Sequence, residues 1–126
     1  MKKIINTDKA PAPLGPYNQA VLANDTLFIS GQIAINPETN ELITSGVEDE
    51  AKLVMKNLEA VLSAADMTFE NVVKSSIFLN DMNDFAKINA IYGAYFDEAT
   101  APARETVAVK TLPKSVNVEI SMIAVK

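Results

Sequence analysis

The sequence contains no cysteine, no histidine and no tryptophan. Cysteine and histidine supply many catalytic nucleophiles and bases, all disulfides and the usual ligands of zinc. Their absence excludes thiolate chemistry, histidine-assisted triads and zinc sites of the common kind. Any catalysis by this chain must therefore use carboxylates, hydroxyls, lysine, arginine, backbone groups or bound water.

Positive charge and long apolar runs are also scarce. The 126 residues include 16 acidic and 11 basic side chains, which gives a formal net charge of −5. An acidic chain lacks the basic face that binds a phosphate backbone, so we expect no nucleic-acid partner. No apolar stretch has the length of a membrane span, and the N-terminal residues lack the apolar run of a signal peptide. We therefore expect a cytoplasmic protein with no membrane partner.

Only one of the eleven basic side chains is an arginine, Arg104. Its planar guanidinium group can hold a carboxylate or phosphate by two parallel hydrogen bonds, which the point charge of a lysine cannot do. Arg104 is therefore a candidate for a specific anion contact. The alternative is an unremarkable surface residue in a lysine-rich protein.

The length fits one domain, residues 1–126, and no linker or repeat divides it. Side-chain patterns predict six strands and two helices in the order β-β-β-α-β-α-β-β. Two helices cannot cover both faces of a six-stranded sheet, so we expect an α+β fold with a mixed sheet, both helices on one face and the other face left to a partner. The predicted strands span residues 3–6, 19–23, 27–34, 72–79, 105–111 and 116–125; the helices follow Ser45 and either Asp81 or Asn83.

The first helix has a recognisable start and one apolar stripe. The stripe is formed at helical spacing by Val47, Ala51, Val54, Leu58, Val61, Leu62 and Ala65. Ser45 and Glu48 have the spacing of a capping box, in which each side chain bonds the backbone of the other residue. Glu48, Asp49 and Glu50 then form an acidic first turn, where the helix dipole favours negative charge. A metal site is the alternative interpretation of this acidic run, and we disfavour it.

The last two predicted strands are separated by four residues, which predicts a hairpin that pairs Thr111 with Val116. In this register, alternation divides the side chains between two faces. The face expected to meet the helices contains Val107, Val109, Val116, Val118, Ile120 and Met122. The opposite face contains Arg104, Thr106, Ala108, Lys110, Asn117, Glu119 and Ser121.

This pairing would place the single arginine and a carboxylate, Glu119, on the same face with Thr106 between them. Arg104 would have to reach back over Thr106, because it begins about four residues (~13 Å) further along the ladder. The hypothesis is a small pocket in which the guanidinium binds an anion and the carboxylate handles a proton or a water; the alternative is a solvated face with a weak salt bridge. Alternation sends Glu105 to the face opposite Arg104.

Several segments spread over the chain resemble the RidA (YjgF) family. Together they are far more specific than any one of them. The segments are APLGPY (12–17), ISGQI (29–33), NDFAKIN (83–89), PAR (102–104) and VEI (118–120), with Val107, Val109 and Leu112-Pro113 also matching.

The resemblance implies a chorismate-mutase-like fold and a homotrimer whose sheets pack together, with clefts between subunits. It also implies hydrolysis of reactive 2-imino acids, 2-iminobutanoate and 2-iminopropanoate, to 2-oxo acids and ammonia, with no cofactor and no metal. In such a site Arg104 would hold the substrate carboxylate and Glu119 would orient the attacking water or accept its proton. Tyr17 of a neighbouring subunit would order water or the leaving nitrogen, and backbone groups near Gly31 and Thr106 would fix the carboxylate and the water.

One departure from the family pattern concerns residues 105 and 106. Many members of the active branch have Ser-Cys after the arginine, whereas this chain has Glu105 and Thr106. An acid beside Arg104 could neutralise it, although alternation should turn Glu105 away. The change bears on efficiency and substrate choice more than on the type of reaction.

Two other functions compete with catalysis by an imine hydrolase. The same cleft could belong to a non-catalytic module that binds 2-oxo acids or related carboxylates and regulates amino-acid metabolism through a partner. Endoribonuclease activity, associated with some relatives, is disfavoured by the acidic charge and the absence of histidine.

Overall fold

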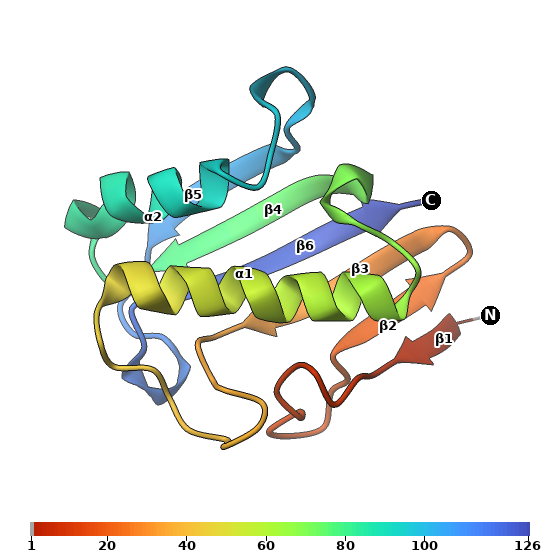
Figure 1. Ribbon diagram of the computed structural model, residues 1–126, viewed down its shortest axis with the longest axis horizontal. Coiled ribbons are helices and arrows are strands. Elements are labelled where there is room, and N and C mark those ends of the chain that lie inside the picture. The colour runs from red at the N-terminus through yellow and green to blue at the C-terminus, as the bar shows by residue number, and fades with distance from the viewer. Residues whose placement is uncertain (1) are drawn as a thin grey trace.

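The computed structural model describes residues 2–126, which form one six-stranded sheet with both helices on the same face (Figure 1). The α+β class and the order of the elements are those predicted. The strands are β1 (Lys2–Ile5), β2 (Ala20–Ala23), β3 (Thr26–Gln32), β4 (Val72–Leu79), β5 (Ala103–Ala108) and β6 (Val118–Val125), and the helices are α1 (Val47–Ala64) and α2 (Phe85–Gly93).

The sheet is mixed, with the spatial order β1-β2-β3-β6-β4-β5. Strands β2 and β3 form a hairpin, and Asn24 in its turn has a positive φ of 53°. Strand β6 lies between β3 and β4 and is antiparallel to both, whereas β5 lies at the edge and is parallel to β4. Strands β1, β2 and β3 are therefore joined to β4 and β5 only through β6.

The predicted hairpin of the last two strands is wrong, because β5 and β6 are not neighbours. Helix α2 returns the chain to the edge of the sheet where β4 begins. Strand β5 therefore runs parallel to β4, as in a strand–helix–strand crossover. Residues 109–117 then carry the chain past β4 to the far side of that strand. The segment read as a hairpin loop is a short 3₁₀ turn, Pro113–Ser115, in this connection.

The pairing of β5 with β4 reverses the predicted orientation of β5. Arg104 pairs with Ser75, which is fully buried on the helix side of the sheet. Glu119 pairs with Phe78, an odd number of residues further along β4, so its side chain points to the opposite face. Arg104 therefore lies on the face of the sheet that the helices cover, here called the helix face. Glu119 lies on the opposite, uncovered face, here called the open face. The predicted reach of Arg104 over Thr106 to Glu119 does not occur within the chain.

The other side chains of this region follow the same reversal. In β6 the predicted alternation is confirmed, since Val118, Ile120 and Met122 are buried under the helices. Val107, predicted to meet the helices, is instead 43% exposed on the open face. Val109 and Val116, assigned to the same group, pack into a second apolar cluster. That cluster contains Ile33, Ile35, Leu42, Phe78, Val109, Leu112 and Val116.

Helix α1 covers the middle of the sheet and its apolar stripe is confirmed as core. Each large aliphatic side chain buried in this way stabilises the fold by roughly 1.5–3 kcal/mol. Among residues 2–126, no helix combines the length and hydropathy that a membrane span requires. The buried side chains of the stripe are Ala51, Val54, Met55, Leu58, Val61 and Leu62, and those beneath them include Leu27, Ile29, Ile77, Leu79, Val118 and Ile120.

The capping box predicted for α1 is wrong. Gly46 occupies the cap position with φ 130°, and no side chain bonds the first turn from there. Ser45 therefore lies one residue too early, and its hydroxyl donates to the Asp49 carboxylate at 2.8 Å. Asp81 does cap the 3₁₀ turn that leads into α2, by accepting from the backbone N–H of Asn83 at 2.9 Å.

The sheet face opposite the helices carries exposed apolar side chains. Ile4, Val21, Phe28 and Ile123 occupy one row across β1, β2, β3 and β6. Phe28 is 48% exposed. A row of this kind is typical of a surface that packs against another protein.

Candidate functional site

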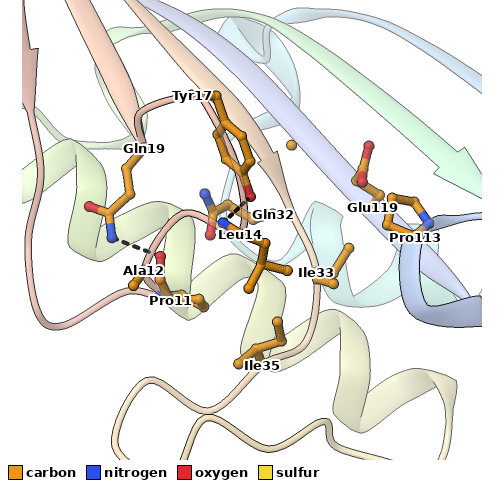
Figure 2. A pocket seen from close by; sticks show the side chains of 11 residues that line it. Pro11, Ala12, Leu14, Tyr17, Gln19, Gln32, Ile33, Ile35, Pro113 and Glu119 are labelled. Atoms are coloured by element: carbon orange, nitrogen blue, oxygen red, sulfur yellow. Dashed lines mark hydrogen bonds between the residues drawn. The ribbon is translucent and has the colours of Figure 1, made fainter.

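A pocket lies where the proline-rich loop (residues 10–17), the end of β3 and the start of β6 meet (Figure 2). It brings together Tyr17, Gly31 and Glu119, three of the five side chains or backbone positions that the sequence indicated. Its lining residues are Pro11, Ala12, Leu14, Tyr17, Gln19, Gly31, Gln32, Ile33, Ile35, Pro113 and Glu119.

The Glu119 carboxyl lies directly over the backbone of Gly31. A Cβ atom added at Gly31 would be 2.7 Å from both the Cδ and the Oε2 of Glu119, closer than van der Waals contact permits. The register between β3 and β6 shifts between Ile29 and Gln32, so this close approach occurs at an irregularity in the ladder. Glycine at position 31 is thus a steric requirement for the placement of the carboxyl.

Burial changes the proton affinity of this group. Desolvation raises the pKa of the Glu119 carboxyl above its ordinary value, because the charged form loses hydration in the pocket. A carboxylate with a raised pKa is a better proton acceptor near neutral pH than an exposed glutamate. The position of Glu119 is therefore suited to the general-base role expected for it.

Tyr17 is held by its own loop. Its hydroxyl accepts a hydrogen bond from the backbone N–H of Leu14 at 3.1 Å, and its backbone N–H donates to the Gly15 carbonyl at 2.8 Å. The side chain is 46% exposed and faces the pocket mouth (Figure 2). Its orientation is set within residues 14–17.

The loop is anchored from below by Gln19, which sequence reasoning missed. This side chain is buried, its Nε2 donates to the carbonyls of Pro11 at 2.8 Å and Thr7 at 2.9 Å, and its Oε1 accepts from the Thr7 N–H at 2.7 Å. One amide thus replaces the backbone pairing that prolines cannot provide. The available sequence signal was a glutamine that closely follows a proline-rich loop.

Arg104 belongs to a second group on the helix face, built by β5 and α2. Its Nη1 donates to the Asn89 side-chain oxygen at 2.7 Å, and its Cζ lies 5.2 Å from the ring centroid of Tyr92 and 5.7 Å from that of Phe85. The contacts with the two aromatic rings and the hydrogen bond to the Asn89 side-chain amide together orient the guanidinium plane. Side chains of α2 therefore hold the guanidinium as well as filling the core.

Tyr92 and Thr106 complete this second group. The Tyr92 hydroxyl donates to the Ser75 hydroxyl at 2.9 Å, and burial raises the pKa of the phenol. The Thr106 hydroxyl oxygen is buried and has no hydrogen-bond partner among residues 2–126. Phe85, Asn89 and Tyr92 recur at helical spacing, a pattern from which their shared face of α2 could have been predicted.

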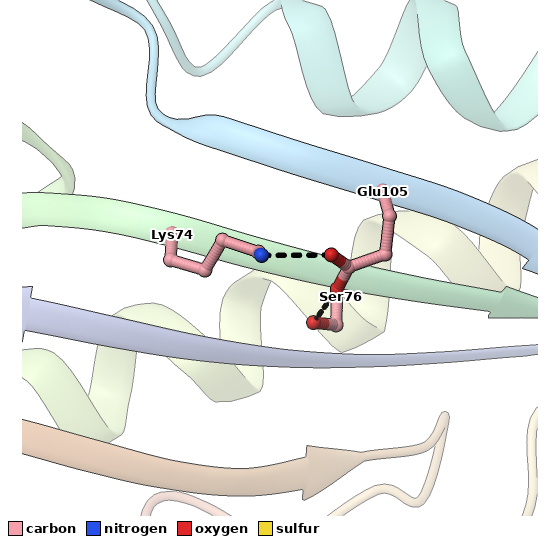
Figure 3. A network of polar contacts seen from close by, with 3 residues as sticks. All are labelled: Lys74, Ser76 and Glu105. Carbon is pink, nitrogen blue, oxygen red and sulfur yellow. Dashed lines mark hydrogen bonds and ion pairs between the residues drawn. The ribbon is translucent and has the colours of Figure 1, made fainter.

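Glu105 points away from Arg104, as alternation predicted. Its Oε1 forms an ion pair with the Lys74 Nζ at 2.7 Å, and it accepts a hydrogen bond from the Ser76 hydroxyl (Figure 3). These hydrogen bonds, that from Lys74 first, lower the pKa of the Glu105 carboxyl. The acid that departs from the family pattern is thus bound on the open face and does not neutralise the guanidinium.

One chain therefore carries two separate groups. Tyr17, Gly31 and Glu119 line the pocket, whereas Arg104 and Thr106 lie under α2 on the other face of the sheet. Each group has one feature suited to a small polar molecule: a carboxyl of raised pKa in the first and an oriented guanidinium in the second.

Known proteins resemble this chain along nearly its whole length. The family described as Endoribonuclease L-PSP matches residues 7–126. A RutC family protein of Synechocystis is 60% identical over 98% of this chain and 95% of the relative, and a mouse protein named 2-iminobutanoate/2-iminopropanoate deaminase is 47% identical over 100% and 93%.

Solved structures agree with these sequence matches. Escherichia coli TdcF, crystallised with bound serine, superposes with a TM-score of 0.92 at 43% identity and covers 98% of each chain. RidA from an Antarctic Psychrobacter superposes with a TM-score of 0.94 at 42% identity, over 98% of this chain and 99% of that one.

Proposed function

Because this chain belongs to the Endoribonuclease L-PSP family, which contains the RidA proteins, we propose that it hydrolyses 2-iminobutanoate and 2-iminopropanoate to 2-oxo acids and ammonia without a cofactor. The observation that carries the proposal is the Glu119 carboxyl, raised in pKa by burial and seated over Gly31 in an otherwise largely apolar pocket. The mouse relative bears the name of this activity at 47% identity.

The reaction needs one water and little else. Water attacks the carbon of the protonated imine while Glu119 takes one proton of the water, which gives a neutral tetrahedral carbinolamine. Glu119 then returns this proton to the nitrogen. As the carbon–nitrogen bond breaks, the hydroxyl group gives its proton to Glu119, so ammonia and the 2-oxo acid leave and Glu119 releases the proton to solvent. The imine also reacts slowly with free water, so holding the two reactants together supplies much of the acceleration.

The substrate carboxylate requires a cation, and Arg104 is the candidate. In one chain it lies on the face of the sheet opposite Glu119, so we propose that Arg104 of one subunit serves the pocket of another. A homotrimer with clefts between subunits provides this arrangement. The exposed apolar row of the open face and the unpaired edge of β5 support such an assembly.

The shape of the pocket favours short aliphatic substrates. Leu14, Ile33 and Ile35 line it beside the carboxyl. An ethyl or methyl group fits such a wall, whereas an acidic side chain would meet Glu119 and be repelled.

The second candidate is a module that binds carboxylates without catalysis, and one observation favours it: the Escherichia coli relative was crystallised with serine. The test generates 2-iminobutanoate enzymatically in the presence of semicarbazide, which traps the free imine. A deaminase reduces semicarbazone formation in proportion to its concentration. A protein that binds 2-oxobutanoate in calorimetry yet leaves semicarbazone formation unchanged is the binding module.

The family name also raises cleavage of RNA. The net charge of −5 and the absence of histidine disfavour it. Degradation of an unstructured RNA by the wild type, lost in an Arg104→Ala variant, would support this third function.

A further inference from the structure

A buried carboxylate lies outside the pocket. Glu50, in the first turn of α1, is only 3% exposed, although a glutamate is almost never buried unless it is paired. Its Oε1 accepts from the backbone N–H of Asn117 at 3.1 Å, and its Oε2 accepts from the Asn117 Nδ2 at 2.6 Å. Both oxygens are thus committed to one residue that is 67 positions away in the sequence.

Asn117 stands at the entry to β6, two residues before Glu119. Its carbonyl accepts from the backbone N–H of Asn80, just after β4, at 3.0 Å. The residue is therefore held on one side by α1 and on the other by the end of β4. Asn117 thus links Glu50 of α1 to the start of the strand that carries the pocket carboxyl.

The segment before Asn117 needs such support. Lys114 and Ser115 both have φ 55°, a left-handed conformation that costs free energy in residues other than glycine. Pro113, the first residue of this turn, lines the pocket beside Glu119 (Figure 2). Strained backbone of this kind persists only where surrounding contacts hold it, and the clamp from Glu50 lies at its end.

We propose that Glu50 is a positioning residue, which acts through Asn117 to hold the Pro113 turn and the start of β6 and so keeps the Glu119 carboxyl seated over Gly31. The inference rests on the proposed function for its catalytic meaning, but the seating of the carboxyl can be measured without substrate. Within residues 2–126, the pocket is lined by one carboxyl, Glu119, and one other titratable side chain, Tyr17. The titration of Glu119 can therefore be followed without a second carboxyl in the same pocket.

The test compares Glu50→Ala with Glu50→Gln by ¹³C NMR titration of the Glu119 carboxyl. Alanine at position 50 removes both hydrogen-bond acceptors of Asn117, so the start of β6 is no longer held. The Glu119 carboxyl then gains access to water, and its pKa falls toward that of an exposed glutamate. Glutamine can accept from the Asn117 N–H and donate to a flipped Asn117 amide, so the pKa should stay near wild type. In the imine assay, kcat/KM should fall about tenfold or more for the alanine variant and little for glutamine.

Asn71→Ala is the matched control. Its Nδ2 donates to the Val125 carbonyl at 3.1 Å, so it removes a side-chain contact from the opposite end of β6. This variant should lose stability without moving the Glu119 titration. If the alanine variant of Glu50 does not fold, Asn117→Ala, which removes only the 2.6 Å bond, should shift the titration in the same direction by less.

Three outcomes would overturn the inference. An equal fall in the Glu119 pKa for both Glu50 variants would show that the charge acts and the geometry does not. An unchanged titration in Glu50→Ala would show that the clamp does not position the carboxyl, as would an equal shift in Asn71→Ala. Absence of deamination by the wild-type protein would instead reject the proposed function and leave the titration result standing.

Discussion

At position 31 the absence of a side chain decides where the Glu119 carboxyl can lie. The nearest obstacle to a Cβ is the far end of Glu119, a flexible side chain, and Gly31 has no positive φ that would forbid alanine. The backbone can therefore accept a methyl group there, and the carboxyl must give way. A substitution at this residue should therefore change activity much more than stability.

Gly31→Ala should accordingly fold and lose activity. The displaced carboxyl no longer meets the water at the required distance, so kcat/KM should fall about 10- to 100-fold with a small change in melting temperature. Gly93→Ala is the control, because open space surrounds that position at the end of α2. It should keep full activity and gain roughly 0.5–1 kcal/mol of stability. Equal activity of the two variants would contradict the proposed role of Gly31.

Glu119→Gln should affect turnover and stability in opposite directions. Glutamine cannot accept the proton of water, so kcat should fall on the order of a hundredfold while 2-oxobutanoate still binds at the arginine. Isothermal calorimetry and the semicarbazone assay measure the two effects separately. A folded variant with unchanged turnover would make Glu119 a structural residue of β6.

The same substitution gives a pH dependence of stability. The folded-state pKa of Glu119 is raised, so its contribution to stability is fully present below the unfolded-state pKa, about 4.3, and is lost as the pH rises through the folded value. The glutamine variant should therefore melt higher than wild type at pH 7 and at the same temperature near pH 3. Denaturation at the two pH values measures the difference; a lower melting temperature for the variant at pH 7 would contradict it.

At the scale of elements, the sequence predicts patterns within one segment well, but it does not predict which strands pair. The stripe of α1 and the alternation of β6 follow from side chains within one segment, and both are confirmed. Alternation divides a strand into two faces but does not name its neighbours. The last two strands were therefore paired with each other, when α2 in fact carries β5 to β4, and this error placed Arg104 on the wrong face.

The candidate site divides in the same way. Tyr17, Gly31 and Glu119 lie in segments that resemble a family, and the structure brings them into one pocket. Glu50 and Asn117 meet across 67 residues by hydrogen bonds, and no local pattern marks such a pair. The sequence showed Glu50 only as one of three acids in a helix first turn, where the dipole alone accounted for it.

The contact between β5 and α2 makes a prediction for the single arginine. Arg104→Lys keeps the charge but loses the Asn89 bond geometry, the stacking and the paired donors for a carboxylate. We expect a loss of roughly 2–3 kcal/mol of transition-state stabilisation, about a hundredfold in kcat/KM, with the melting temperature little changed. Asn89→Ala, which frees the guanidinium without removing it, should lose less. Near wild-type deamination by the lysine variant would show that charge alone suffices.

For the whole molecule, two features support the proposed homotrimer: the exposed apolar row on the open face, and the separation of Arg104 from the pocket that contains Glu119. We expect light scattering to give the mass of a trimer at micromolar concentration. Phe28→Glu places a charge in the centre of the exposed apolar row and should dissociate the assembly. The dissociated variant should also lose activity, because the proposed site combines Arg104 of one subunit with Glu119 of another. A fully active monomer would contradict the shared site.

The place of β6 in the sheet has a consequence for how the chain folds. This strand follows every other strand in the sequence, yet it lies between β3 and β4 and alone connects the two halves of the sheet. Until it inserts, β3 and β4 each present an unpaired inner edge, and neither half has its complete core. The strand synthesised after the other five is thus the one that completes the single cooperative unit, so a nascent chain stalled before residue 118 would expose two unpaired strand edges to chaperones.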